Sequence, residues 1–189
     1  MKTYFLPSLK ITIMLLVLLC GLYPLVISGI GKFTPGHGNG ETVTLNGHIV
    51  GYANIGQKFT KDKYFNSRPS AANCLPDAGV GSNKGPSNAD YLKDVKTRID
   101  TFLKHNPDVK REDIPAELVT ASGSGLDPDL SPAGAKIQVA RIATVRNLSV
   151  ERVNKIVDDN IEKPLLGLFG PPKVNVLKLN VALDELKGK

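Results

Sequence analysis

The stretch ITIMLLVLLCGLYPLVISGI, residues 11–30, decides the architecture of this chain of 189 residues. It contains no charged side chain and is flanked by Lys10 and Lys32. At about 1.5 Å of rise per helical residue it would span about 30 Å, the thickness of a bilayer core. We therefore predict one transmembrane helix at 11–30, after a short N-terminus (1–10). A linker (31–41) and one soluble domain (42–189) would follow it.

A secretory signal peptide is the alternative interpretation of this stretch. Lys2 and Lys10 would form its basic start, and Gly29 and Gly31 would be the small residues near a cleavage site. The apolar run is, however, longer than the roughly 7–15 residues that are usual in signal peptides. We therefore favour an anchor that is retained.

The charges around the anchor predict its orientation. Lys2, Lys10 and the terminal amine precede it, whereas Lys32 alone follows closely. Cytoplasmic flanks of membrane helices carry the excess of Lys and Arg. We expect a single-pass protein of the cytoplasmic (inner) membrane, with a cytoplasmic N-terminus and an extracytoplasmic main domain.

Gly21 and Pro24 interrupt the apolar run. Both residues would bend an isolated helix, and membrane helices tolerate them where a neighbour satisfies the freed backbone groups. The pattern is consistent with a partner helix in the membrane and equally with a kink in a lone anchor.

Composition excludes some classes of function. The net charge is +6, but Lys and Arg are scattered and not interleaved with aromatic residues, so we expect no nucleic-acid partner. His37, His48, His105 and Cys74 lie far apart in the sequence, which argues against a metal site. Since Cys20 lies inside the predicted span, a disulfide framework is not expected either.

Turn signals and apolar spacing predict the elements of the soluble domain. Asn46-Gly47 within residues 42–52 predicts a hairpin of two short strands. Residues 59–65 are consistent with a short helical turn. Residues 67–88, rich in Gly, Ser, Pro and Asn, predict a long loop of a kind that is often functional.

Three helices are expected to begin after N-terminal caps, and a fourth to end the chain. The caps are Ser87, Ser131 and Ser149, and the last helix would follow a strand near Val174. In the second helix, Ile137, Ala140 and Thr144 would share one face, with Arg141 and Arg146 elsewhere. The predicted fold class is α+β, with one N-terminal transmembrane helix, three to four further helices and a small antiparallel sheet.

No nucleophile and base stand out together. Asp127 and Asp129 flank Pro128 and would suit a membrane-anchored hydrolase as paired carboxylates, although this context is more typical of a turn ahead of a helix. The Gly-Ser loops could hold phosphate through backbone amides. However, residues 81–85 lack the Gly-Lys-Ser/Thr ending of a P-loop.

Four blocks of sequence together carry a resemblance to a known family. They are YFNSRPSA (64–71), GSNKGPSN (81–88), PAELVTASGSGLDP (115–128) and VNVLKLN (174–180). In this order after one N-terminal anchor, they resemble the C subunit of the Kdp-type potassium-transporting P-type ATPase. Almost the whole chain takes part.

The resemblance implies a non-catalytic accessory subunit of an ATP-driven, high-affinity potassium uptake complex. The implied partners are a channel-like potassium-translocating subunit, a P-type ATPase subunit and a small single-helix subunit. The chain lacks an Asp-Lys-Thr-Gly-Thr phosphorylation motif, consistent with aspartyl-phosphate chemistry in the ATPase subunit. No firmly bound cofactor is implied, and ATP would act through that subunit.

Two roles are attached to the family. One is a catalytic chaperone that raises ATP affinity, for which Ser131 at a helix start and Gln138 would contact nucleotide. Gln138 is equally consistent with an exposed helical residue. The other is a domain over the outer mouth of the channel-like subunit, which cannot meet cytosolic ATP. The partner- or nucleotide-facing candidates are Arg68, Ser82, Asn83, Ser87, Ser122, Ser124, Asp127, Ser131 and Gln138.

Overall fold

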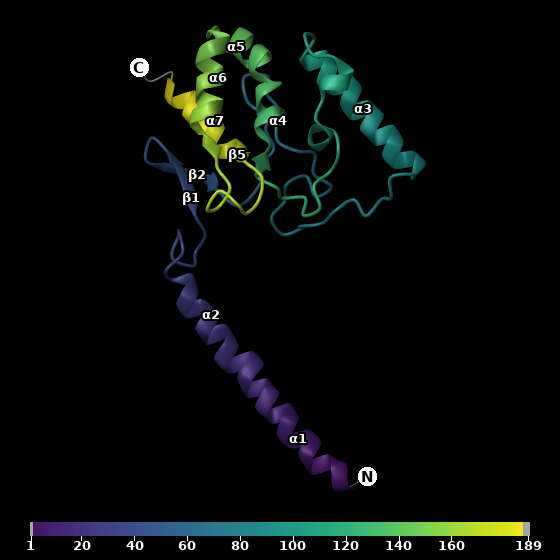
Figure 1. The fold of residues 1–189 in the computed structure, drawn as a ribbon, viewed down its shortest axis with the longest axis vertical. Coiled ribbons are helices and arrows are strands. Elements are labelled where there is room, and N and C mark those ends of the chain that lie inside the picture. The colour runs from purple at the N-terminus through teal and green to yellow at the C-terminus, as the bar shows by residue number, and fades with distance from the viewer. Residues whose placement is uncertain (1, 187–189) are drawn as a thin grey trace. The chain divides into compact units, whose positions relative to one another are not determined.

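A computed structural model describes residues 2–186, with side chains from residue 4 onward. The chain divides into two compact units, with the boundary in the sequence between Thr42 and Val43. The first unit contains one apolar helix, built from α1 (Lys2–Leu16), a π-helical stretch (Val17–Leu22) and α2 (Tyr23–Gly31) (Figure 1). Its residues Tyr4–Gly31 are long and apolar enough to cross a membrane. One apolar helix was predicted, but it extends further toward the N-terminus than the expected bounds of 11–30.

The π-helical stretch ends at Leu22, two residues before Pro24. Proline has no N–H to donate to the carbonyl of Cys20, and its ring crowds that carbonyl. A local π-helix accommodates such a defect without ending the helix. The interruption predicted at Gly21 and Pro24 therefore appears as a change of helix type.

The predicted hairpin is confirmed. Strands β1 (Thr42–Leu45) and β2 (His48–Tyr52) flank the two-residue turn of Asn46 and Gly47. Both turn residues have positive φ, +52° and +79°. A type I′ turn requires this conformation, which Asn and Gly adopt at low cost.

The remaining elements form a mixed α+β domain. The helices are α3 (Ala89–His105), α4 (Pro132–Lys136), α5 (Val139–Arg146), α6 (Val150–Asp159) and α7 (Val176–Glu185), with 3₁₀ turns at Arg111–Asp113 and Ala116–Leu118. The strands are β3 (Asp129–Leu130), β4 (Ile161–Glu162) and β5 (Lys173–Asn175). They form an antiparallel sheet in the order β3-β5-β4, in which Leu130 and Ile161 both pair with Val174.

The core lies where α4 to α7 meet this sheet. Val174 of β5, Ile142 of α5, Val157 of α6 and Leu183 of α7 are all fully buried. Helix α3 contributes no buried residue and lies at the edge of the domain (Figure 1). Val95, Ile99, Phe102 and Leu103 of its apolar stripe are half-buried, and Leu92 is 53% exposed.

The structure corrects the start of α3. Ser87 is not its cap. Asn88 occupies that position and its side chain accepts a hydrogen bond from the Tyr91 N–H at 3.0 Å. The caps predicted at Ser131 and Ser149 are confirmed, since their hydroxyls accept from the N–H groups three residues later.

The helix predicted from Ser131 onward is broken in two at Gln138. The Gln138 side chain donates to the Gly134 carbonyl, which its own backbone N–H would bind in a continuous α-helix. That N–H turns to the Ala135 carbonyl instead. Ile137, Ala140 and Thr144 line one cavity, as expected for residues that share a face. Thr144 is nevertheless exposed, and Ile142 is the fully buried residue of this turn.

Candidate functional site

The first sequence block runs through the domain without joining a sheet. The Asn180 side chain accepts from the Phe65 N–H at 2.8 Å and donates to the Phe65 carbonyl at 3.0 Å. Gln138 holds the N–H and carbonyl of Asn66 in the same way, at 2.8 and 3.2 Å. The two side-chain amides replace the partner strand that a buried backbone needs. The segment is therefore not helical, apart from one hydrogen-bonded turn at residues 61–64.

Two buried arginines of α5 bind the same segment. Arg141 Nη1 donates to the carbonyls of Asp62 and Tyr64, and Arg146 Nε donates to the Lys63 carbonyl. The guanidinium group presents several donors in a fixed plane, which suits successive carbonyls of an irregular segment. Both arginines are buried, and their role in holding this segment was not predicted from the sequence.

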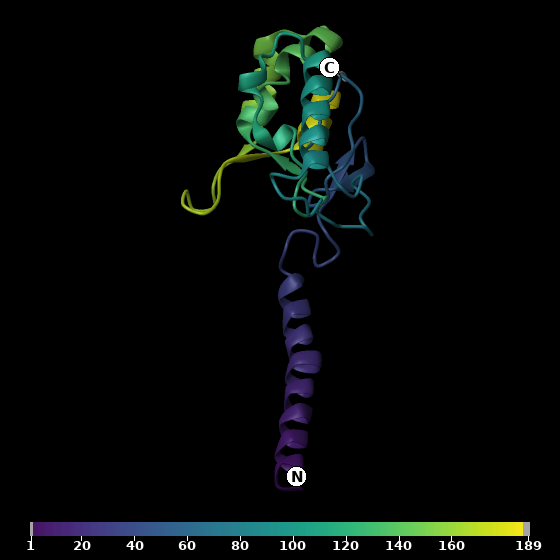
Figure 2. The ribbon, with the colours of Figure 1, turned by 90° about the vertical axis from the view of Figure 1, so that its right-hand side faces the viewer.

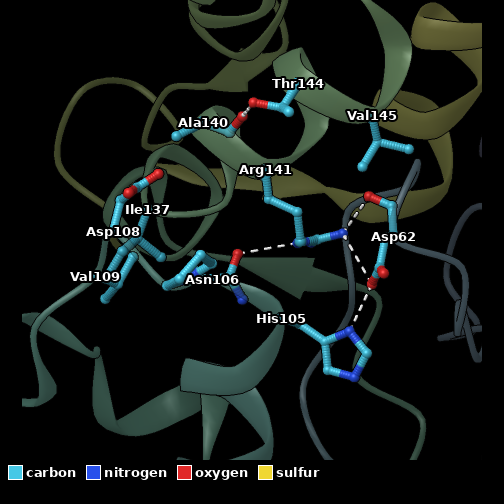
Figure 3. Close-up of a pocket in the computed structure, with 11 residues that line it drawn as sticks. Asp62, His105, Asn106, Asp108, Val109, Ile137, Ala140, Arg141, Thr144 and Val145 are labelled. Atoms are coloured by element: carbon cyan, nitrogen blue, oxygen red, sulfur yellow. Dashed lines mark hydrogen bonds and ion pairs between the residues drawn. The ribbon is translucent and has the colours of Figure 1, made fainter.

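A cavity of about 190 Å³ opens beside Arg141, between the end of α3 and α5 (Figure 3). Arg141 Nε donates to Asn106 Oδ1 at 2.9 Å, and His105 Nδ1 lies 2.8 Å from Asp62 Oδ1. Burial lowers the pKa of Arg141, and the nearby Asp62 charge partly opposes this shift. The hydroxyl of Thr144 donates to the carbonyl of its own helix (Figure 3). The His105–Asp62 pair thus adjoins Arg141, whose Nη1 lies 4.0 Å from Asp62 Oδ1.

A second, half-buried cluster links the first block to α7. Arg146 Nη2 and the Tyr64 hydroxyl each lie 2.8 Å from the carboxylate of Asp184. Burial raises the pKa of Tyr64, and its hydrogen bond to Asp184 raises it further. Tyr64 therefore remains a neutral donor that helps to hold this end of the segment.

The first and third blocks form one layer of loops. Arg68 and Asp127 form an ion pair at 2.8 Å, with each side chain about a quarter exposed. The Ser70 hydroxyl donates to the Gly125 carbonyl at 2.6 Å, and the Ser122 N–H donates to the Pro69 carbonyl. Gly125 has a φ of +70°, and a Cβ at this position would lie 2.6 Å from the carbonyl oxygen of Val80. A side chain at this position would force the layer apart.

The second block packs against the third through glycines. A Cβ on Gly81 would meet the Gly123 carbonyl oxygen at 2.8 Å, so the two backbones approach more closely than any other residue allows. Further along the block, Lys84 pairs with Asp94 of α3 at 3.1 Å on the surface.

The fourth block completes the layer. Lys173 Nζ lies 2.6 Å from Asp129 Oδ2, and this hydrogen bond is the main reason that the pKa of Lys173 is raised. The Asn175 side chain donates to the Ala53 carbonyl at 2.7 Å and accepts from the Lys178 N–H at the start of α7. The Val176 N–H donates to the Pro128 carbonyl at 2.9 Å, and Asn180 holds Phe65, so the fourth block contacts both the third and the first. All four blocks therefore meet in one region of the domain, which we call the loop layer.

Asp127 and Asp129 do not face one another as a catalytic pair. Each has a cationic partner, Arg68 or Lys173. Asp127 Oδ1 also accepts from the Asp129 N–H at 3.1 Å, which is an Asx turn. The arrangement agrees with a turn ahead of α4.

The nine candidates from the sequence do not form one cluster. Two are buried, Ser122 and Gln138. Four are half-buried, Arg68, Ser82, Asp127 and Ser131, and three are exposed, Asn83, Ser87 and Ser124. The structure brings Arg68 and Asp127 together as a direct pair.

The polar groups of Gln138 and Ser131 are engaged inside the domain. Gln138 is 0% exposed, and its Oε1 also accepts from Arg141 Nη2 at 2.8 Å. Its interpretation as an exposed helical residue was wrong. The Ser131 hydroxyl donates to Glu117 at 2.6 Å and accepts from the Gly134 N–H at 3.0 Å.

Sequence reasoning missed four side chains that organise the region, Asn66, Asn180, Arg141 and Arg146. Asn180 gave a usable signal, since it lies in the apolar run of the fourth block. A polar residue at a core position needs a partner, and Asn180 has one in Phe65. Within residues 4–186, no group of three or more His, Cys, Asp or Glu is placed to hold a metal ion.

Known proteins are similar to this chain over nearly its full length. Residues 5–185 match the family described as "K+-transporting ATPase, c chain". A potassium-transporting ATPase KdpC subunit of Bacteroides fragilis is 54% identical over 100% of both chains. The subunit of the same name from Phocaeicola vulgatus is 53% identical over 97% of this chain and 98% of its own. The subunit of the same name from Caldanaerobacter subterraneus is 46% identical over 95% of this chain and 94% of its own.

Proposed function

Since the chain belongs to the KdpC family of c chains of potassium-transporting ATPases, we propose that it is a non-catalytic accessory subunit of a high-affinity potassium uptake complex. Its proposed partners are a channel-like subunit, a P-type ATPase subunit and a small single-helix subunit. The single N-terminal helix would hold it in the membrane beside them.

The convergence of the four blocks in the loop layer is the observation that supports this proposal. Polar side chains of these blocks, including Arg68, Ser70 and Asn175, bind other parts of the same domain. Groups engaged in this way fix the shape of a surface and are poorly placed to react with a substrate. We infer that the layer presents a rigid surface to a partner subunit.

The effect of the chain on ATP affinity would then be indirect. Contact of nucleotide with Gln138 would require the loss of its bonds to Asn66 and Arg141. Ser131 caps α4, a helix of five residues, and its hydroxyl is taken by Glu117. We propose that the chain favours a conformation of its membrane partners in which ATP binds more tightly. Binding of the chain and binding of ATP would then stabilise the same conformation.

The proposed orientation places the N-terminus in the cytoplasm and the domain outside, from the charge bias of Lys2 and Lys10 over Lys32. Cys74 is a free, half-buried cysteine at a cleft of the domain, and Cys20 lies within the span. A membrane-impermeant thiol reagent should label Cys74 in intact spheroplasts. Labelling only after lysis, with the denatured protein equally reactive, would contradict this orientation and reopen direct nucleotide contact.

The accessory role is tested by assembly. The remaining subunits are expressed with and without this chain, and the channel-like subunit is purified through a tag. We expect the ATPase subunit to co-purify in much larger amount when the chain is present. Equal recovery of an intact complex in its absence would contradict a role in assembly.

A further inference from the structure

The connection between β4 and β5 is an apolar hairpin. We call residues 164–172 the apolar tip. It extends away from the rest of the domain (Figure 2), and no residue in it is charged. Its four largest apolar side chains are strongly exposed, namely Leu165 (69%), Leu166 (82%), Leu168 (81%) and Phe169 (63%). Exposed apolar surface gathered in one place marks contact with a membrane or with another protein.

The backbone of the apolar tip satisfies most of its own hydrogen bonds. The Leu165 N–H donates to the Phe169 carbonyl at 3.1 Å, and the Phe169 N–H returns to Leu165 at 3.0 Å. The N–H groups of Gly167 and Leu168 donate to the carbonyls of Pro164 and Leu165. A protein partner could supply such bonds, but hydrocarbon cannot, so a segment that enters lipid must supply them itself.

Prolines strengthen this argument at both ends of the tip. Pro164, Pro171 and Pro172 have no N–H that would need a partner. Lys163 precedes the tip directly, and a lysine at this place can extend its ammonium group to the lipid headgroups.

A bilayer is also always within reach. The chain carries its own membrane helix, which ends at Gly31. The residues between this helix and β1 number about ten and span at most about 35 Å when fully extended. The linker therefore keeps the start of β1 within about 35 Å of the end of the helix, whereas a protein partner is present only in the assembled complex.

We propose that the apolar tip inserts into the interfacial region of the bilayer that holds the anchor. Leu165, Leu166, Leu168 and Phe169 would contact phospholipid acyl chains, and Lys163 the headgroups. The tip would be a second membrane contact that limits rotation of the domain about its linker. This contact belongs to the chain itself and does not depend on the proposed role in assembly.

The test uses the absence of tryptophan from the chain. Phe169→Trp introduces a single fluorophore at the tip of the full chain. The protein is reconstituted in phosphatidylcholine–phosphatidylglycerol vesicles, with or without bromine on the acyl chains as a quencher. We expect emission at shorter wavelength than in water, and loss of most of the emission in brominated vesicles. Leu92→Trp on α3, exposed to 53%, is the matched control and should keep its emission.

A second variant separates insertion from accidental contact. Leu166→Asp combined with Leu168→Asp, in the Phe169→Trp chain, should restore water-like emission while circular dichroism stays unchanged. Water-like, unquenched emission from Phe169→Trp itself would overturn the proposal. Burial of this tryptophan only after the other subunits are added would also overturn it, and would identify the tip as a protein-docking element.

Discussion

Replacing Gln138 with Ala is predicted to destabilise the domain through the segment that this side chain holds. The change removes bonds to the N–H and the carbonyl of Asn66, and others to Gly134 and Arg141. A buried polar group left without a partner costs about 1–3 kcal/mol. With both backbone groups of Asn66 affected and packing lost, the free energy of unfolding should fall by about 3–5 kcal/mol.

This loss corresponds to a fall of roughly 6–20 °C in the midpoint of thermal unfolding, at about 2–4 °C per kcal/mol for a domain of this size. The midpoint is followed by circular dichroism of the full chain in detergent. Thr144→Ala, at an exposed position on α5, is the control and should change stability by less than about 0.5 kcal/mol. An unchanged midpoint for Gln138→Ala, together with weaker ATP binding by the complex, would refute the structural role and favour contact with nucleotide.

Three further predictions concern the anchor, a helix cap and the sheet. Gly21 and Gly29 have open space around them, so the double variant Gly21→Leu, Gly29→Leu should leave the chain folded. It should lower co-purification of the chain with the channel-like subunit, because small residues allow close packing of helices. Unchanged recovery would assign all of the binding to the soluble domain. Ser149→Ala removes the cap of α6 and should cost about 1 kcal/mol in denaturant unfolding. The pKa of Lys173 is raised above its ordinary value of 10.5 in the folded domain. The ion pair of Lys173 therefore contributes its full stability below pH 10.5, and this contribution is lost as the pH rises through the higher pKa of the folded state. Asp129→Asn should therefore reduce the loss of stability in alkaline titration, and an identical pH profile would contradict this.

Local signals in the sequence were sufficient for several elements. The turn at Asn46-Gly47 and the cap at Ser149 depend on neighbours within three residues, and both are confirmed. The cap of α3 was misplaced by one residue because Ser87 and Asn88 are both good caps. The length and composition of the anchor likewise sufficed to predict one apolar helix.

The arrangement of the candidate site could not be predicted in the same way. The bond between Gln138 and Asn66 joins positions 72 residues apart, and that between Arg141 and Tyr64 joins positions 77 apart. Nothing in the local sequence of a helix shows that its arginine binds the carbonyls of a distant segment. Family resemblance singled out the four blocks, but their meeting in the loop layer depends on such long-range contacts.

The proposal that this chain is a required accessory subunit is tested by potassium-stimulated ATP hydrolysis of the remaining subunits, purified with and without the chain. We predict that the complex without the chain shows no hydrolysis that depends on potassium, and that restoring the chain restores it. Full potassium-stimulated hydrolysis in its absence would rule out an accessory role for this chain.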